Sequence, residues 1–590
     1  MSEGSASTST SHGDLDSSRS VKLVVAVDFG TTYSGYAFSI GSHRTIYMMK
    51  KPTGGAGDQK IPTCLLLEPD LKFHSFGKGA QYHYYNELEE AEQHEWLYFD
   101  RFKMSLHSSK SLNRDKTLKA ACGREILALT VFARSLEFFK DNALEDINAA
   151  SATDFRLHEV TWVVTVPAIW EEPSKQFMRE AAYMAGMADS AKPDQLIIAL
   201  EPEAASLYCR QMEMLERNLS GAAVLGQLKP ETRYIVADCG GGTVDCTIHE
   251  ITERKHIKAL QPPSGGPWGG TEVDKNFENL LANIFGYEYL QQFKLKEPAE
   301  WVDLISVNFE NSKRDFSQGR SPPAIRIDAL IRFLRDEGQQ ADQMVRDFAN
   351  QNVTLRRGAL RLTKEEVTAL FTPVVNKIRD HIVSMVQKIN GLKYVVMVGG
   401  FSESSYLAPV ITETFKEQIP VIVPHDARLA VVKGAVLFGQ NPNAICERRA
   451  ANTVGIGTTQ PFIEGYHRPT FRISGLTAEE DLCDNVFETF VQANDAVEVG
   501  KSVQKSFSPS FERQMDALVD IYFSPNRDVA YTTEEGVSHK GEMLVPLNGC
   551  GLDREVKISM YFGESEFKVT ASDETGRRKQ VTVNFLGRYN

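Results

Sequence analysis

One pattern occurs twice in this chain, and each copy places an aspartate, glycines and threonines directly after an apolar strand. The first copy, residues 24–35, reads VVAVDFGTTYSG, and the second, residues 234–245, reads YIVADCGGGTVD. Their aspartates, Asp28 and Asp238, are separated by 210 positions in the sequence. A long internal repeat of this kind predicts two related halves that build the same turn.

The residue types of the repeat suit the binding of phosphate groups. Glycine lets backbone N–H groups approach phosphate oxygens because no Cβ stands in the way, and threonine adds hydroxyl donors. An aspartate at the end of a strand is an oxygen ligand of the kind that hydrated Mg²⁺ prefers. An ordinary hairpin with a glycine turn is the better explanation of a single copy. Two copies with the same aspartate favour a pair of turns that hold a triphosphate from both sides.

The chain divides into four predicted segments. Residues 1–20 contain eight serines, two threonines and almost no large apolar group, so we expect a disordered tail. Residues 21–445 alternate strand runs with long helical patterns, which predicts an α/β architecture. Residues 446–452 are the predicted linker, and residues 453–590 carry short alternating runs between turns, which is typical of a smaller all-β domain. The expected strands of that domain are Val497–Val503, Ala517–Phe523, Glu555–Phe562, Glu566–Ala571 and Gln580–Phe585.

Several segments of the α/β part end in residues that suit a ligand cleft. Val160–Val166 and Leu196–Leu200 are predicted strands, and the second is followed by Glu201. A carboxylate at that strand end would point into the cleft, although a solvated loop acid explains it equally well. A helix is expected from about Pro173 to Ala185.

Two further segments extend the possible cleft. Four polar residues share the spacing of one helical face, but a solvated face explains that spacing as well; they are Glu310, Lys313, Arg314 and Ser317. A capping box at Thr363 opens a predicted helix through Ile389. The strand Tyr394–Val398 then ends in Gly399-Gly400-Phe401-Ser402. A helix after these glycines would offer N–H groups and a positive dipole end to a nucleotide, and close packing at the turn is the alternative.

Composition excludes several classes of protein. The net charge of −13 argues against a general nucleic-acid binder. None of the eight cysteines forms a Cys-x-x-Cys pair, so neither a zinc site nor a disulfide framework is expected. No apolar run approaches the roughly 20 residues that span a bilayer, and no secretory signal is recognised. We therefore expect a cytoplasmic protein, with the nucleus an open alternative, and with no nucleic-acid partner or membrane span.

In this order, the motifs resemble those of the seventy-kilodalton heat-shock proteins, which have the actin-like ATPase fold also found in sugar kinases. The resemblance covers roughly residues 22–587. It rests on seven motifs: Asp28-x-Gly30-Thr31-Thr32-Tyr33, Val164–Ala168, Glu201-Pro202-x-Ala204-Ala205, Asp238-x-Gly240–Thr243-x-Asp245, Gly269-Gly270, Glu310-x-x-Lys313-Arg314-x-x-Ser317 and Val398–Ser402. Five further runs resemble the atypical subfamily called heat shock 70 kDa protein 12: Ala26–Thr32, Trp96–Phe99, Phe102–Met104, Gln176–Arg179 and Gly434–Gly439.

The resemblance implies that ATP or ADP and Mg²⁺ are the cofactors, and it implies a role for each motif residue. Thr31, Thr32, Tyr33 and Gly240, Gly241, Gly242 and Thr243 are expected to hold the phosphates, and Gly30, Gly269 and Gly270 are expected among the cofactor-binding residues. Asp28 and Asp238 are expected to order the waters of Mg²⁺. The catalytic set is Lys103, Glu201, Asp238 and Asp245, in which Lys103 positions and Asp245 orients the attacking water. The adenosine set is Glu310, Lys313, Arg314, Ser317, Gly399, Gly400 and Ser402, with Arg314 stacked on the base.

The C-terminal β segment resembles the family's peptide-binding sandwich, which implies extended peptides or protein clients, and co-chaperones, as partners. Three departures stand out. Glu403 occupies the position of a second adenine-stacking arginine. The linker, Ile445–Ala451, lacks the leucine-rich acidic run of typical members. No helical lid or acidic tail is recognised after the last strand.

Three functions compete on the sequence alone. The first is a chaperone-like protein that binds ATP, hydrolyses it weakly and holds extended peptides. The second is a non-enzymatic scaffold or sensor in which the nucleotide acts as a switch. The third is a small-molecule kinase, which the β domain argues against. The acids Asp28, Glu201, Asp238 and Asp245 favour hydrolysis, whereas the altered linker and the missing lid favour the scaffold.

Overall fold

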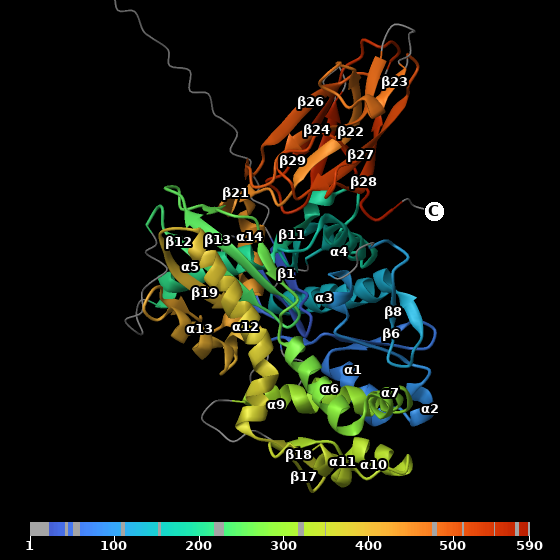
Figure 1. Cartoon of the computed structure of the whole chain (residues 1–590), viewed down its shortest axis with the longest axis vertical. Coiled ribbons are helices and arrows are strands. Elements are labelled where there is room, and N and C mark those ends of the chain that lie inside the picture. The colour runs from blue at the N-terminus through green and yellow to red at the C-terminus, as the bar shows by residue number, and fades with distance from the viewer. Residues whose placement is uncertain are drawn as a thin grey trace, which may run out of the picture.

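The computed structural model describes residues 23–41, 45–50, 59–107, 112–151, 155–216, 229–316, 324–348, 350–474, 481–509, 512–547, 549–572 and 578–587. The predicted tail, residues 1–20, lies outside these ranges. The elements from β1 to α14 form the larger, lower part of the molecule in Figure 1, and the strands from β22 onward form its upper part.

The first lobe is built on a six-stranded sheet whose central strand is β1 (Leu23–Asp28). β1 pairs in parallel with β10 (Val160–Val166) and antiparallel with β2 (Tyr33–Ile40). The order is β11-β10-β1-β2-β3, and β4 also pairs with β2. The remaining strands are β3 (Tyr47–Met48), β4 (Ile61–Pro62) and β11 (Leu196–Leu200).

The second lobe repeats this arrangement around β12 (Arg233–Cys239). β12 pairs antiparallel with β13 (Val244–Ile251) and in parallel with β19 (Leu392–Val398), as β1 does with β2 and β10. The sequence repeat therefore corresponds to a structural repeat. The order of this eight-stranded sheet is β20-β19-β12-β13-β14-β21-β25, with β15 paired to β13. Its other strands are β14 (Ile257–Ala259), β15 (Ser264–Gly266), β20 (Val421–Ile422), β21 (Ile445–Arg449) and β25 (Ala496–Glu498).

The three largest hydrophobic clusters among the described residues of the lobes form their cores. Alternate residues of β1 point into different clusters because side chains alternate across a strand. Leu23, Val25 and Val27 pack with α3 (Ala128–Ala150) and α4 (Glu172–Met184) in the first lobe. Val24 and Ala26 belong to a second cluster between the two sheets, where α5 (Glu201–Glu216) lies against α14 (Ala430–Gln440). This contact is close, since a Cβ at Gly434 would lie 1.7 Å from the Ala204 carbonyl oxygen.

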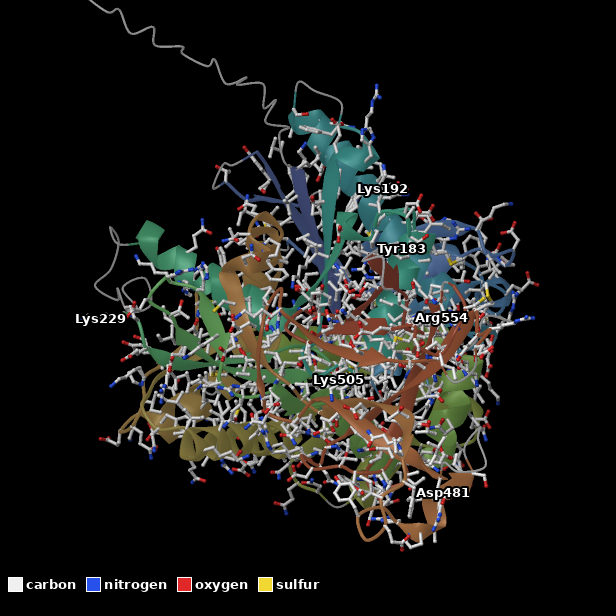
Figure 2. The ribbon with its side chains drawn as sticks, turned by 90° about the horizontal axis from the view of Figure 1, so that it is seen from above. Tyr183, Lys192, Lys229, Asp481, Lys505 and Arg554 are labelled. Atoms are coloured by element: carbon white, nitrogen blue, oxygen red, sulfur yellow. The ribbon has the colours of Figure 1, made fainter. Side chains whose placement is uncertain are left out.

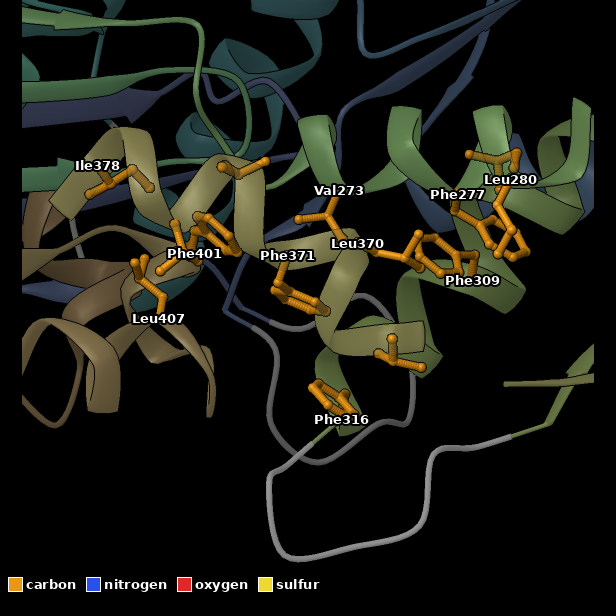
Figure 3. Close-up of a cluster of buried hydrophobic side chains, with 14 of the residues drawn as sticks. Val273, Phe277, Leu280, Phe309, Phe316, Leu370, Phe371, Ile378, Phe401 and Leu407 are labelled. Atoms are coloured by element: carbon orange, nitrogen blue, oxygen red, sulfur yellow. The ribbon is translucent and has the colours of Figure 1, made fainter. Parts of the chain in front are cut away.

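The third cluster fills the second lobe, where α6 (Thr271–Phe285) crosses α12 (Lys364–Lys388). Figure 3 shows Phe371 of α12 close to Phe401, and their rings stack at 6.4 Å. These two rings also form one wall of the cavity described below. The other helices of this lobe are α7 (Tyr287–Lys296), α8 (Pro298–Val302), α9 (Glu310–Asp315), α10 (Asp328–Asp336), α11 (Ala341–Asp347) and α13 (Leu407–Phe415).

Both lobes also contain smaller helices and strands. The first lobe carries α1 (Lys78–Tyr82), α2 (Glu90–Gln93), β5 (Cys64–Leu67), β6 (Phe73–Phe76), β7 (Leu97–Asp100), β8 (Thr117–Lys119) and β9 (Glu125–Leu127). The second lobe carries β16 (Ala324–Arg326), β17 (Val353–Arg356) and β18 (Ala359–Leu362).

The C-terminal part consists of two antiparallel sheets that share one buried cluster. The first has the order β23-β24-β22-β27-β28, with β22 (Thr453–Pro461), β23 (Arg472–Ser474), β24 (Asp481–Val491), β27 (Asp516–Ser524) and β28 (Ser538–Pro546). The second has the order β26-β29-β30-β31, with β26 (Ser502–Phe507), β29 (Val556–Tyr561), β30 (Lys568–Ser572) and β31 (Arg578–Val581).

The predicted linker forms strand β21. It pairs in parallel with β14 of the second lobe and antiparallel with β25. The C-terminal part also contacts α4, the helix that contains Tyr183, which is labelled in the view from above in Figure 2. Arg179 of α4 binds Glu566 at 2.5 Å, and Gln176 accepts the Phe585 N–H at 2.8 Å. The lobes and the C-terminal part are therefore connected both by strand pairing and by an ion pair.

Most predicted elements agree with the structure, and three differ. The expected strand Gln580–Phe585 is present only at its start, because β31 ends at Val581. The strand predictions over 160–166 and 196–200 match β10 and β11, and Thr363 caps α12 by accepting the Glu366 N–H. The expected strand Val497–Val503 is instead divided between β25 and β26, because Gly500 has a φ of 79° and turns the chain. After Gly399 a short 3₁₀ turn, Gly400–Glu403, precedes α13, so no α-helix begins at the glycine pair. No helix in the described ranges is long and apolar enough to cross a membrane.

Candidate functional site

The two repeated hairpins meet at the floor of a cavity between the lobes. A Cβ at Gly241 would lie 2.3 Å from the Thr32 Oγ1, and one at Gly242 would lie 2.4 Å from the Thr31 Oγ1. Only glycine lets the turns approach this closely, because real Cβ atoms do not come within 3.0 Å of other heavy atoms. The predicted pair of facing turns is therefore present in the structure.

The cavity measures about 350 Å³, a volume in the range of small-molecule sites. Most of the predicted site residues line it: Asp28, Gly30, Thr31, Thr32, Tyr33, Lys103, Glu201, Asp238, Gly240, Gly241, Gly242, Thr243, Gly270, Glu310, Lys313, Arg314, Gly399 and Gly400. Residues from both halves of the chain thus converge on one space.

Three predicted residues lie beside the cavity without lining it. Gly269 donates its N–H to the Gly242 carbonyl at 3.1 Å and so supports the second turn. Asp245 is buried behind the turn, where its Oδ1 accepts the Ile169 N–H at 2.9 Å. Ser402, predicted for the adenosine side, is buried next to the cavity, where its hydroxyl donates to the Val398 carbonyl at 2.6 Å, and Ser404 lines the cavity. The predicted Ser317 lies outside the described residues.

Four buried carboxylates and two lysines surround the floor. The Lys103 Nζ lies 2.6 Å from the Glu201 Oε1, and both side chains are buried. Burial raises the pKa of Glu201 to about 7, although Lys103 opposes the shift. Burial also raises the pKa of Asp245 to about 6, and it raises that of Asp238 well above the ordinary value, with the charge of Glu201 adding to the effect. Glu201, Asp238 and Asp245 therefore bind protons more readily than isolated carboxylates do.

This donor set fits a hydrated divalent cation. Carboxylates outnumber ammonium groups at the floor, where the acids are Asp28, Glu201, Asp238 and Asp245 and the lysines are Lys60 and Lys103. A cation would balance the excess negative charge. In the described part of the chain, no three His, Cys, Asp or Glu side chains are placed to bind a metal directly. Mg²⁺ keeps several of its waters when carboxylates bind it, and Asp28 and Asp238 are the acids of the floor that line the cavity next to the two turns.

The opposite wall carries the residues predicted for the sugar and base. Lys313 bridges Asp274 at 2.7 Å and Glu310 at 2.6 Å. Burial disfavours the charge of Glu310, but Lys313, Arg101 and Arg314 outweigh it and lower the pKa of Glu310 to about 2. Glu310 is therefore an anion at neutral pH and can accept hydrogen bonds from ribose hydroxyls.

Arg314, on the same wall, lies over the Tyr33 ring with its guanidinium carbon 4.1 Å from the ring centroid. A planar guanidinium in this position is placed to stack on an aromatic base as well. Gly399, with a φ of 85°, comes so close to Asp238 that a Cβ would lie 2.3 Å from the carboxylate Oδ1. This glycine therefore lies between the wall that carries Arg314 and the floor that the two turns form.

The sequence analysis missed several lining residues, of which Lys60 and Arg428 carry charge. Lys60 precedes the two-residue strand β4, and Arg428 precedes α14, where its N–H donates to the Glu403 carboxylate at 3.1 Å. Neither belongs to a motif or a periodic pattern. Arg101, also unassigned, links the lobes by binding Asp274 at 2.5 Å from a left-handed φ of 53°.

Comparison with known proteins gives a consistent result. The family model described as "Hsp70 protein" matches residues 105–446. The chain is 36% identical to mouse "Heat shock 70 kDa protein 12A", over 96% of this chain and 91% of that protein. It is 38% identical to human "Heat shock 70 kDa protein 12B", also over 96% and 91% of the two chains. It is 24% identical to the "Mitochondrial-type heat shock protein 70" of Encephalitozoon hellem, over 74% of this chain and 69% of that protein.

Proposed function

Because the chain belongs to the Hsp70 family, whose members bind nucleotides in a two-lobed actin-like fold, we propose that it binds Mg–ATP between its lobes and hydrolyses it slowly. We further propose that it acts as a chaperone-like protein that holds extended peptides in its C-terminal part.

The observation that carries the proposal is the contact between the two repeated turns. They present N–H groups and threonine hydroxyls from opposite sides, and charge-assisted hydrogen bonds of this kind contribute about 1.5–3 kcal/mol each. Glu310, Lys313 and Arg314 lie on the opposite wall of the same cavity, where ribose and base would extend. A nucleoside triphosphate would fit both parts of the cavity, with its phosphates at the two turns and its nucleoside at the opposite wall.

The residues at the floor suit hydrolysis. Lys103 is fixed against Glu201, so its ammonium can orient a water for attack on the terminal phosphate. Burial raises the pKa of Asp245 to about 6, so this carboxylate, which lies behind the turn, is suited to accept a proton near neutral pH through one water. Bound Mg²⁺ would supply charge neutralisation for the phosphates. Asp28 and Asp238 would hold its waters.

A second cavity supports the peptide proposal. About 970 Å³ lies between the two C-terminal sheets, with apolar residues such as Ile456, Val519 and Ile558 in its lining. Lys505 and Glu488 form an ion pair in the same lining. An extended apolar peptide with polar main-chain contacts would fit this mixture of surfaces.

A nucleotide-dependent scaffold is the second candidate, and the junction between the parts favours it. Arg448 of β21 binds Glu203 at 2.7 Å and also donates to the Gly563 carbonyl, and both charged side chains are buried. Such a connection would hold the C-terminal sheets in place and limit an ATP-driven release of peptide.

The test is a titration of the purified chain with ATP, with and without Mg²⁺, followed by a turnover assay on the same sample. Tight binding with slow phosphate release supports the ATPase. Tight binding without turnover favours the scaffold. The absence of binding under both conditions would refute the nucleotide proposal. Release of a labelled apolar peptide, measured with and without ATP, then separates the two candidates, because only the chaperone cycle accelerates release.

A further inference from the structure

Lys60 has no role in the repeated motif, yet it reaches the phosphate floor. Its Nζ lies 2.5 Å from the Asp28 Oδ2, and the two side chains are only 15% and 6% exposed. Lys60 lines the same cavity as Thr31, Thr32 and Asp238. A buried ammonium is thus present where a triphosphate would carry its greatest negative charge.

The backbone holds this lysine in place. β4 begins at the next residue and pairs with β2, with Ile61 opposite Ser34. The aliphatic part of Lys60 lies over Gly35, where a Cβ would come within 3.0 Å of the lysine Cγ. Gly35 is also the partner of Asp28 across the β1–β2 ladder. The Lys60 side chain therefore passes over Gly35, where no Cβ blocks it, and its ammonium contacts Asp28.

The contact with Lys60 reduces the number of further hydrogen bonds that the Asp28 carboxylate can accept. Its Oδ2 accepts from Lys60 and its Oδ1 accepts from the Thr165 hydroxyl at 3.2 Å. Both carboxylate oxygens already have protein donors, so Asp28 has less capacity for metal-bound water than Asp238. An ammonium group has three N–H donors. Lys60 can therefore hold Asp28 and still donate to a phosphate oxygen.

A purely structural ion pair is the alternative, since a buried carboxylate needs a partner. The position of Lys60 in the lining of the cavity distinguishes a structural ion pair from a phosphate-binding residue. A structural pair would be indifferent to phosphate, whereas an ammonium that faces the cavity would bind it.

We propose that Lys60 is a phosphate-binding residue of this cleft, and that its ammonium supplies part of the charge neutralisation otherwise provided by a divalent cation. The inference rests on the proposed binding of ATP. It implies that the cleft retains a triphosphate after the divalent cation is removed, and that this retention depends on Lys60.

Three variants test the proposal. Lys60→Met keeps the aliphatic length and removes the charge, and Lys60→Arg keeps the charge. Lys50→Met is the matched control, because Lys50 is a lysine of the same lobe that is 60% exposed. Isothermal titration measures the dissociation constant of ATP with Mg²⁺, of ATP with EDTA, and of inorganic tripolyphosphate with EDTA.

We expect Lys60→Met to weaken both metal-free ligands by about ten- to a hundredfold, the effect of one charge-assisted hydrogen bond. Its affinity for Mg–ATP should fall several times less. Lys60→Arg should stay closer to the wild type, and Lys50→Met should be unchanged. Circular dichroism checks that each variant is folded. If Lys60→Met does not fold, Asp28→Asn with Lys60→Met removes both charges, and the same metal-free loss is expected.

The outcomes distinguish the two proposals. If the wild type binds Mg–ATP and folded Lys60→Met loses no more metal-free affinity than Lys50→Met, Lys60 is a structural partner of Asp28 and this inference is wrong. If the wild type binds neither ATP nor tripolyphosphate under any condition, both the nucleotide proposal and this inference are wrong.

Discussion

Replacing Arg448 by methionine tests the junction between the two parts of the molecule. Arg448 lies on β21, and its guanidinium makes two hydrogen bonds to Glu203 of α5, at 2.8 and 2.7 Å. It donates a third to the carbonyl of Gly563, in the loop between β29 and β30. Arg448 and Glu203 are 8% and 4% exposed. One side chain therefore joins the strand between the parts, the first lobe and the C-terminal sheets.

The expected cost follows from this burial. Methionine has a similar length but leaves the Glu203 carboxylate buried without its cation, and breaking a buried pair in this way costs about 3–5 kcal/mol. Removing both charges in Arg448→Met with Glu203→Met leaves no uncompensated ion, so the double variant should return to within about 1–2 kcal/mol of the wild type. The neighbouring Arg449, which is 3.8 Å from Glu447 and more exposed, should cost less than about 1 kcal/mol when changed to methionine.

Urea denaturation of the four proteins gives the free energies of unfolding, and small-angle X-ray scattering gives their dimensions. We expect Arg448→Met to unfold at lower urea and to have a larger radius of gyration, because the C-terminal sheets lose an anchor. A cost below about 1 kcal/mol with unchanged dimensions would show that the pair is solvated and that the sheets are not docked through it.

Three further predictions concern the cavity. Asp238→Asn should weaken Mg²⁺-dependent ATP binding and turnover by at least about tenfold, because the metal waters lose an anionic acceptor; unchanged titrations would make the turn purely structural. Burial raises the pKa of Glu201 from 4.5 to about 7, so between these pH values the folded state holds a proton on this carboxyl that the unfolded state has lost. The free energy of unfolding should therefore fall as pH rises from about 4.5 to 7, by up to about 3 kcal/mol. Urea midpoints across this range should flatten in Glu201→Gln, and an unaltered profile would contradict the assignment. Gly241→Ala places a Cβ 2.3 Å from the Thr32 Oγ1 and should lower ATP affinity about ten- to a hundredfold, as overpacking by 1–3 kcal/mol implies. Gly79→Ala, whose Cβ would lie 3.7 Å from its nearest neighbour, should leave affinity unchanged, and equal effects of the two would refute the contact between the turns.

The parts of the site that sequence could predict are those encoded locally. The glycine and threonine positions follow directly from the strand before them, so the turns at Asp28 and Asp238 were predictable residue by residue. The strand β11, which ends before Glu201, and its parallel neighbour β10 were also predicted with their observed bounds, because buried parallel strands are short continuous apolar runs. The repeat then implied that the turns face each other, which the close approach of Gly241 to Thr32 confirms.

The parts that sequence could not predict depend on contacts between distant residues. Lys60 lies in no periodic pattern, and only the pairing of β4 with β2 brings it to Asp28. Ser402 was assigned to the cavity from its place after the glycines, but the 3₁₀ turn directs its hydroxyl to the Val398 carbonyl. The sequence of the linker does not have the pattern of a strand. It forms β21 because it pairs with strand β14, and this pairing cannot be predicted from its own residues.

Helix α5 connects the cavity between the lobes to the junction with the C-terminal sheets. Glu201 and Glu203 both lie in its first turn, and residues two apart on a helix point to different sides. Glu201 faces the cavity and binds Lys103, whereas Glu203 faces β21 and binds Arg448. A nucleotide that displaced Lys103 from Glu201 would therefore act on the same turn of helix that holds the C-terminal sheets. Coupling between sites is reciprocal, so Arg448→Met should change ATP affinity if this turn moves as a unit. An unchanged affinity in a folded Arg448→Met protein would instead identify the pair as a fixed clamp, which is the behaviour that a scaffold requires.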